Sequence, residues 1–340
     1  MKAERNLVAG AGLHLPRLGF LGVGWIGRHR LASVLETEAG EAMAIADPSP
    51  EMLDAARALA PAAVTVPDLN AMLDLDLDGI VIATPSALHA RQAELALRRG
   101  LAVFCQKPLG RTGSEVAAVL SAARAADRLL AVDFCYRFAE GTARIKALAE
   151  KGALGEIHAA DLVFHNAYGP DKPWFRDVAL SGGGCVMDLG VHLVDLALWM
   201  LDFPEVEAVS SDLFAGGRRL GPDPDVVEDF AVATLRLSGG AVVRLSCSWN
   251  LHAGRDAEIA AVFHGSHGGA ALRNVDGSFY DFAAEAYRGT SREVLASPPD
   301  PWGGRAVVDW ARRLGADRRY DPRADRLFDV SRVLDRIYGR

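Results

Sequence analysis

The sequence is poor in cysteine, and its few cysteines lie far apart. A chain of 340 residues holds only Cys105, Cys135, Cys185 and Cys247, and no two of them form a Cys-x-x-Cys pair. Structural zinc sites, thioredoxin-like redox sites and disulfide frameworks need closely or regularly spaced cysteines. We therefore predict a reducing, cytoplasmic setting and no metal site.

Positive charge and long apolar runs are also lacking. The 37 Lys and Arg residues are outnumbered by 44 Asp and Glu residues, which leaves a net charge of −7. This balance argues against a nucleic-acid-binding surface. No uninterrupted apolar run reaches the roughly 18 residues typical of a membrane helix, and residues 1–16 lack the apolar core of a signal peptide. We predict no membrane span and expect residues 1–16 to form a loose leader.

Two kinds of pattern divide the chain, whose length also favours two domains over one core. In residues 1–137, short and continuously apolar runs alternate with helical segments. This alternation predicts right-handed βαβ units and a buried, doubly wound parallel sheet. In residues 138–340, strand-like runs follow one another directly, which predicts an antiparallel sheet. The amphipathic residues 323–340 predict a terminal helix, which we expect to pack back towards the first domain.

A glycine-rich turn lies where the first strand meets the first helix. The segment GFLGVGWIGRH places Gly22, Gly24 and Gly27 in G-x-G-x-x-G spacing. Such glycines allow a tight turn, close approach of the backbone to a pyrophosphate and close packing of helix on strand. Free N–H groups at the helix start favour phosphate. We predict a dinucleotide site that Trp25 and Ile26 also line; the alternative is an ordinary α/β turn.

An acidic residue at the end of the second strand indicates which dinucleotide binds. Asp47 stands where it would hydrogen-bond an adenine-ribose hydroxyl. Its carboxylate would repel a 2′-phosphate, and the following Pro48, Ser49 and Pro50 supply no arginine to accept one. We therefore predict NAD as the cofactor in preference to NADP.

The most apolar helical segment carries three polar residues. Asp188, His192 and Asp195 are spaced by four and three residues, which places them on one face of a helix. The surrounding residues are apolar nearly all round, so the helix is expected to be buried. Buried carboxylates are costly unless they are paired or used. The stripe is therefore either a satisfied core network or a functional site, with Asp195 expected to be structural.

Several motifs together resemble a known family. The glycine motif, ATPSALH (83–89), QKP (106–108) and SGGGCVMDLGVHLVDLALW (181–199) resemble, in this order, the glucose-fructose oxidoreductase / inositol dehydrogenase / MocA (Gfo/Idh/MocA) family. The resemblance implies an N-terminal Rossmann domain and a C-terminal α/β domain built on a large open, mostly antiparallel sheet. That sheet would join a homodimer or homotetramer. The implied reaction is NAD-dependent hydride transfer to or from a secondary alcohol or ketone of a sugar, cyclitol or related polyol.

The resemblance also assigns residues by position. Lys107 matches the lysine of the family's E-K-P motif, and Asp188 and His192 match its D-x-x-x-H pair, so these three are the implied catalytic residues. Thr84 and His89 match positions that line the nicotinamide-ribose side of the cofactor.

One position departs from the family pattern. Gln106 stands where the family usually has Glu, which keeps a hydrogen-bonding carbonyl but removes a negative charge beside Lys107. We count Gln106 among the cofactor-binding residues. Trp174 and His165 are further candidates for substrate contacts, since aromatic faces pack on sugar C–H surfaces; the alternative for each is a packing role.

The expected chemistry follows from these residue types. Histidine is the usual proton carrier near neutral pH, so we predict His192 as general acid/base. Asp188 would hold the substrate hydroxyl or the imidazole, and Lys107 would stabilise the reacting oxygen; Lys107 and His192 could exchange roles. A metal site on the stripe is disfavoured, because three ligands from one helix face seldom close a coordination sphere. The remaining alternative is a dinucleotide-binding regulator without turnover, for which Gln106 is the only hint.

Overall fold

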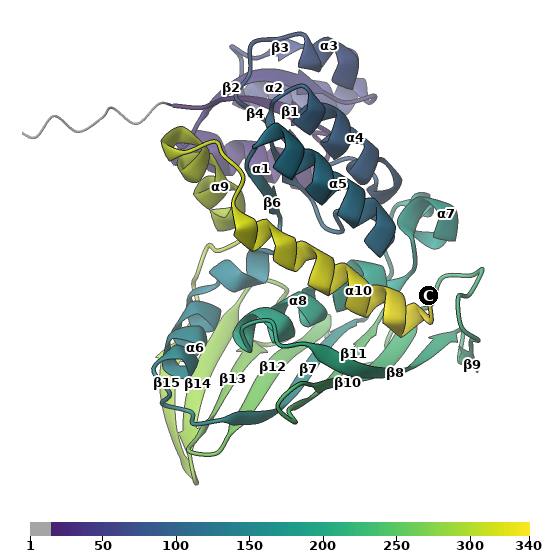
Figure 1. Ribbon diagram of the computed structural model, residues 1–340, viewed down its shortest axis with the longest axis vertical. Coiled ribbons are helices and arrows are strands. Elements are labelled where there is room, and N and C mark those ends of the chain that lie inside the picture. The colour runs from purple at the N-terminus through teal and green to yellow at the C-terminus, as the bar shows by residue number, and fades with distance from the viewer. Residues whose placement is uncertain (1–14) are drawn as a thin grey trace, which may run out of the picture.

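A computed structural model describes residues 15–340 and contains two sheets, one in each half of the chain (Figure 1). The expected leader, residues 1–16, lies almost wholly outside the described residues. The first sheet is parallel and has six strands in the order β3-β2-β1-β4-β5-β6. This order confirms the predicted doubly wound Rossmann sheet.

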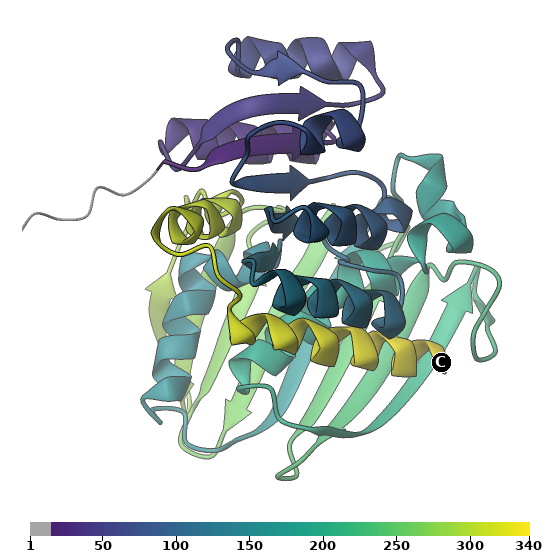
Figure 2. The same cartoon turned by 45° about the horizontal axis from the view of Figure 1, so that its top comes forward.

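Helices cover both faces of this first sheet (Figures 1 and 2). Its strands are β1 (Arg17–Leu21), β2 (Glu41–Ala46), β3 (Val64–Thr65), β4 (Gly79–Ile82), β5 (Ala102–Cys105) and β6 (Leu130–Val132). Its helices are α1 (Trp25–Glu36), α2 (Pro50–Leu59), α3 (Leu69–Leu73), α4 (Ser86–Arg98) and α5 (Gly113–Ala126). Strands β1, β4 and β5 are almost wholly buried, as expected for central strands of a parallel sheet.

The second sheet has nine strands in the order β15-β14-β13-β12-β7-β11-β10-β8-β9. Among the described strands of this sheet, the β7–β11 pair alone is parallel, so the predicted mostly antiparallel sheet is confirmed. The strands are β7 (Ile157–Asn166), β8 (Val206–Ala215), β9 (Arg218–Arg219), β10 (Phe230–Leu237), β11 (Val242–Ser248), β12 (Ala257–Gly265), β13 (Gly269–Asn274), β14 (Phe282–Arg288) and β15 (Ser291–Ala296).

The helices of this half lie on the side of the sheet that faces the first domain (Figures 1 and 2). They include η1 (Cys135–Phe138), α6 (Glu140–Glu150), η2 (Pro173–Arg176), α7 (Val178–Ser181), a π-helical turn η3 (Val186–Gly190), α8 (Val191–Met200), α9 (Arg305–Ala316), η4 (Pro322–Asp325) and α10 (Arg326–Tyr338). Among the described residues, no helix covers the opposite face.

Two late helices return to the first domain. The apolar face of α9 joins the Rossmann core, where the Trp310 ring lies 5.7 Å from that of Phe104. Helix α10 packs along α5, and Asp335 accepts a hydrogen bond of 2.8 Å from the Gly113 amide. A boundary at residue 137 therefore describes chain order but not packing, because α9 completes the core of the first domain.

The helical segment Val178–Met200 is long and apolar enough, by length and composition, to cross a membrane. However, 89% of its most apolar window is buried inside the protein. A left-handed turn at Gly182, with φ of +84°, also breaks the segment after α7. We conclude that α8 is a core helix, held between the second sheet and α10.

The cysteines are not as isolated as their spacing in the sequence indicates. The Sγ atoms of Cys185 and Cys247 lie 3.8 Å apart, and both residues are buried with free thiols. Within residues 15–340, no group of three or more His, Cys, Asp or Glu side chains is arranged to hold a metal ion.

Candidate active site

A cavity of about 1790 Å³ lies between the two domains, at the carboxyl ends of the Rossmann strands. Ligands bind at this edge of doubly wound sheets. The predicted residues that line the cavity are Gly22, Gly24, Trp25, Ile26, Asp47, Thr84, His89, Gln106, Lys107, Trp174, Asp188 and His192. Most of the residues chosen from sequence therefore converge on one space.

The three motif glycines are required for different reasons. Gly22 has a φ of +82°, which other residues rarely adopt, and a Cβ on Gly27 would lie 2.0 Å from the Gly22 carbonyl oxygen. At Gly24, by contrast, φ is −60° and a Cβ would meet no atom within 4 Å. Neither packing nor backbone strain requires glycine there. The open space at Gly24 fits the close approach of a dinucleotide pyrophosphate to the backbone.

Asp47 is tied to the glycine turn. Its carboxylate accepts hydrogen bonds from the Val23 amide (2.8 Å) and the Ser49 amide (2.9 Å). This places an acidic group beside the turn, on the side that holds adenosine in Rossmann domains.

Arg28 adds a cation near Asp47 that sequence neighbours did not reveal. Its Nη1 lies 2.9 Å from the Met52 sulfur and 3.4 Å from the Val23 carbonyl oxygen. Arginine in such a position can accept a 2′-phosphate. The lack of arginine directly after Asp47 therefore does not by itself exclude NADP, because Arg28 also lines the cavity.

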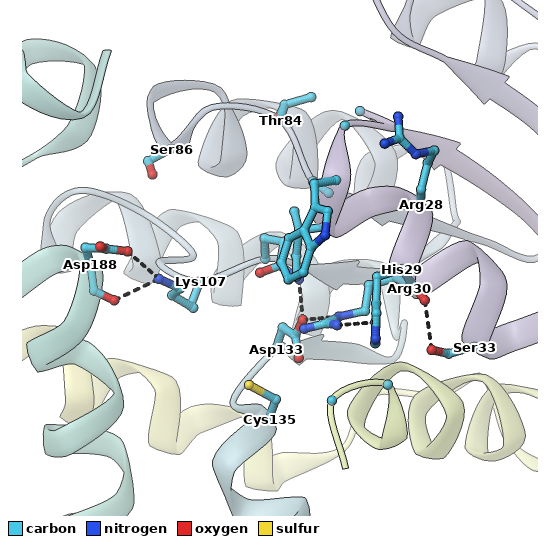
Figure 3. A pocket seen from close by; sticks show the side chains of 18 of the residues that line it. Arg28, His29, Arg30, Ser33, Thr84, Ser86, Lys107, Asp133, Cys135 and Asp188 are labelled. Atoms are coloured by element: carbon cyan, nitrogen blue, oxygen red, sulfur yellow. Dashed lines mark hydrogen bonds and ion pairs between the residues drawn. The ribbon is translucent and has the colours of Figure 1, made fainter. Parts of the chain in front are cut away.

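An ion pair joins the two domains inside the cavity. The Lys107 ammonium, just after β5, donates to Asp188 Oδ1 (2.8 Å) and to the Asp188 carbonyl oxygen (2.7 Å) (Figure 3). Asp188 Oδ2 accepts from the Trp249 indole at 3.1 Å. Both charged side chains remain partly exposed, at 19% and 17%. The structure therefore joins Asp188 to Lys107 and Trp249, and not to the imidazole of His192.

The helix that carries Asp188 and His192 is not α-helical throughout. Residues Val186–Gly190 form a π-helical turn, which holds one residue more than an α-helical hydrogen-bonded turn. Asp188 lies within this turn, and His192 and Asp195 lie in the α-helix that follows it. Single π-turns of this kind are frequent at functional sites.

His192 is a buried, neutral imidazole at the cavity wall. Its Nδ1 is enclosed without a hydrogen-bond partner, and Tyr136 packs edge-on at 5.0 Å between ring centres. Burial, with the positive charges of Lys107 and Arg30, holds the pKa of His192 well below its usual range. A neutral imidazole at pH 7 is able to accept a proton.

Asp195 belongs to a structural ion pair. Its carboxylate binds the Arg137 guanidinium through two contacts, one of them 2.8 Å long. Burial raises the pKa of Asp195, which Arg137 opposes. The guanidinium also lies over the rings of Phe134, Trp199 and Phe203. This pairing supports the expectation that Asp195 is structural.

His89 ties together two loops at the cavity. Its ring nitrogens lie 2.6 Å from the Thr84 carbonyl oxygen and 2.7 Å from that of Pro108. His89 is buried, and burial lowers its pKa. It thus fixes the loop after β4 against the loop that carries Lys107.

Glu228, which the sequence analysis missed, holds the start of the helix that carries the polar residues. This fully buried carboxylate accepts from the amides of Gly184 (2.9 Å) and Val186 (2.8 Å) and from the Tyr338 hydroxyl (2.8 Å). A Cβ on Gly184 would lie 1.9 Å from the Glu228 carbonyl oxygen. Close packing therefore accounts for this glycine. No local motif could have indicated contacts across 44 residues.

Two predicted residues have other surroundings. Gly27 packs within the turn and does not line the cavity. His165 was expected to contact substrate, but its neighbour Phe164 takes the cavity face, since adjacent side chains of a strand point to opposite faces. His165 instead hydrogen-bonds Ser248 at 2.8 Å and stacks on Phe230. His165 therefore does not line the cavity, and the expected substrate contact is not supported.

The cavity combines an open glycine turn, a carboxylate on the adenosine side and the side chains of Lys107, Asp188 and His192. These features are typical of a two-domain, dinucleotide-binding oxidoreductase. The family models agree: residues 16–134 match the "Oxidoreductase family, NAD-binding Rossmann fold", and residues 142–271 match the "GFO/IDH/MocA C-terminal domain". The chain belongs to the Gfo/Idh/MocA oxidoreductase family.

Individual relatives are moderately similar. A D-glucoside 3-dehydrogenase of Escherichia coli is 28% identical over 66% of this chain and 64% of its own length, slightly under two thirds. A proposed UDP-kanosamine synthase oxidoreductase subunit of Amycolatopsis mediterranei is 34% identical over 76% of this chain and 75% of its own. The structure of levoglucosan dehydrogenase with NADH and levoglucosan has a TM-score of 0.79 at 23% identity, covering 95% of this chain and 96% of that one. The last similarity shows a shared fold.

Replacing Gly24 with alanine should weaken NAD binding without unfolding the protein. The added methyl group meets no protein atom but occupies the space that a pyrophosphate needs, so we expect about a tenfold rise in Kd. Titration calorimetry measures the affinity, and thermal unfolding checks stability. Gly221→Ala is the matched control, because it too is open on all sides and lies outside the cavity lining. Equal NAD affinity in both variants would contradict this role.

Proposed function

We propose that this protein is an NAD-dependent dehydrogenase or reductase that acts on a secondary hydroxyl or ketone of a sugar, cyclitol or related polyol. The observation that carries the proposal is the Lys107–Asp188 pair beside neutral His192, at the end of a cavity that continues to Gly24 and Asp47. The names of the relatives, which concern glucosides, a kanosamine nucleotide and levoglucosan, support a carbohydrate substrate.

The cofactor would lie along the predicted residues of the first domain. Gly22, Gly24 and Trp25 would hold the pyrophosphate, and Asp47 the adenine ribose. Thr84, His89 and Gln106 would lie on the nicotinamide side, with His89 acting through the loops that it fixes. When bound, NAD supplies the hydride acceptor, while the protein supplies position and charge.

The side chains of the polar centre have distinct proposed roles. His192 takes the hydroxyl proton, because its imidazole is neutral at pH 7. Lys107 stabilises the negative charge that develops on the substrate oxygen, and Asp188 aims the ammonium with two oxygen atoms. Trp174 lines the cavity stacked on Phe175 and offers an aromatic face to a sugar.

Turnover of a sugar panel tests the proposal. We expect NAD reduction, followed by absorbance, with at least one sugar, cyclitol or amino sugar. Lys107→Ala and His192→Ala should each lower kcat/KM by about 10²–10⁴-fold, because one removes the oxygen's charge partner and the other the proton acceptor. His165→Ala, on the far face of the sheet, should leave kcat/KM nearly unchanged. Tight NAD binding without turnover of any compound, in either direction, would favour the alternative of a dinucleotide-binding regulator.

We further propose that the protein is a homodimer or homotetramer through the uncovered face of the nine-stranded sheet. Val232 is 37% exposed there, and Asp161 and Arg244 form a 2.6 Å ion pair on the same face. Light scattering should give two or four times the mass of the chain. A monomeric mass at micromolar concentration would contradict this proposal. The cytoplasmic location expected from the cysteines stays a prediction.

A further inference from the structure

A buried network of three polar side chains lies at the ends of β5 and β6. Arg30, Gln106 and Asp133 are 4%, 7% and 1% exposed. Asp133 Oδ2 accepts a hydrogen bond of 2.5 Å from Arg30 Nε and another from the side-chain amide of Gln106. Figure 3 shows the contact between Arg30 and Asp133 apart from the Lys107–Asp188 pair. All three side chains also line the cavity.

Asp133 determines which way the Gln106 amide points. Asp133 Oδ2 accepts from Arg30 and from the Gln106 amide nitrogen, so the amide turns its N–H group towards Asp133. The Gln106 carbonyl oxygen, Oε1, is then left for the cavity. Within residues 15–340, this oxygen has no protein partner and is not among the enclosed unpartnered atoms. It is therefore an oriented acceptor that a ligand can reach.

The sheet order identifies the part of the ligand that would meet this oxygen. Asp47 follows β2 and marks the adenosine side, and β1 separates β2 from β4, β5 and β6. A dinucleotide crosses the sheet at this switch point, so its nicotinamide lies over the β4–β6 side. Gln106 directly follows β5 and precedes Lys107. The group nearest to Oε1 should be the nicotinamide carboxamide, which carries two N–H donors.

We propose that Gln106 Oε1 accepts a hydrogen bond from the nicotinamide carboxamide, and that the Arg30–Asp133 ion pair fixes the direction of this acceptor. The proposal rests on the proposed dinucleotide function and deepens it. It also gives a physical reason for Gln where the family usually has Glu. A carboxylate at position 106 would face that of Asp133, and two carboxylates in contact cannot both ionise without cost.

The test compares three ligands that differ at the nicotinamide end. NAD carries the carboxamide, 3-acetylpyridine adenine dinucleotide carries a methyl group in place of its NH₂, and ADP-ribose lacks the ring altogether. Dissociation constants are measured by calorimetry. The unchanged protein should bind NAD about tenfold more tightly than the acetylpyridine analogue, because the analogue leaves the buried acceptor unpaired.

Substitutions at Gln106 separate an acceptor from a packing group. Gln106→Met removes the oxygen at similar size, so the tenfold preference for NAD should fall to near one while the ADP-ribose Kd stays the same. Gln106→Glu retains an acceptor oxygen and should keep a preference, although thermal unfolding should show a less stable protein. Gln106→Met and Gln106→Glu thus form a matched pair that differs in the presence of the acceptor oxygen.

Both the unchanged protein and the Gln106→Met variant can give results that overturn the proposal. The proposal would be overturned if the unchanged protein showed no preference for NAD over the acetylpyridine analogue. It would also be overturned if the Gln106→Met variant kept that preference. Equal losses for NAD, its analogue and ADP-ribose in Gln106→Met would also overturn it, because they would show a general disruption of the site. ADP-ribose binding and sugar turnover report on the proposed function separately, so the preference can fail while the function holds.

Discussion

The ion pair between Lys107 and Asp188 is the contact on which the site depends. Each residue comes from a different domain, one after a Rossmann strand and the other from a π-helical turn above the second sheet. Partly exposed ion pairs add little to stability, so its importance lies in position. It places an ammonium at the wall that also carries His192, and the positive charge contributes to the low pKa of that histidine.

Buried polar groups around the pair hold it in place. Glu228 anchors the start of the helix, Arg137 neutralises Asp195, and His89 binds the loop that follows Lys107. Each buried carboxylate among them has a charged or hydrogen-bonding partner, as burial requires. His192 differs from these carboxylates, because its enclosed Nδ1 has no hydrogen-bond partner. In the polar stripe of the apolar helix, Asp195 thus belongs to a core network, whereas Asp188 and His192 line the cavity.

Local patterns predicted those features of the fold and site that depend on local chemistry. Strand–helix alternation indicated the Rossmann sheet, and the glycine motif with Asp47 indicated the cradle. Long-range features had no such signal: α9 crosses back to Phe104, and Arg30, Asp133 and Glu228 act through residues distant in sequence. His165 was misplaced because composition does not show which face of a strand a residue takes. The π-turn was missed because residue spacing cannot distinguish it from an α-helix.

The most direct test of whether His192 is the general base is the pH dependence of kcat/KM for a sugar that the protein oxidises. In the free enzyme, the acid limb of this profile reports the pKa of the essential base. Because burial and Lys107 lower the pKa of His192, activity should stay level as pH falls through about 6.5, the ordinary histidine value, and decline only below it. An acid limb that begins at or above about pH 8 would contradict the account, since it would indicate a base of the lysine kind.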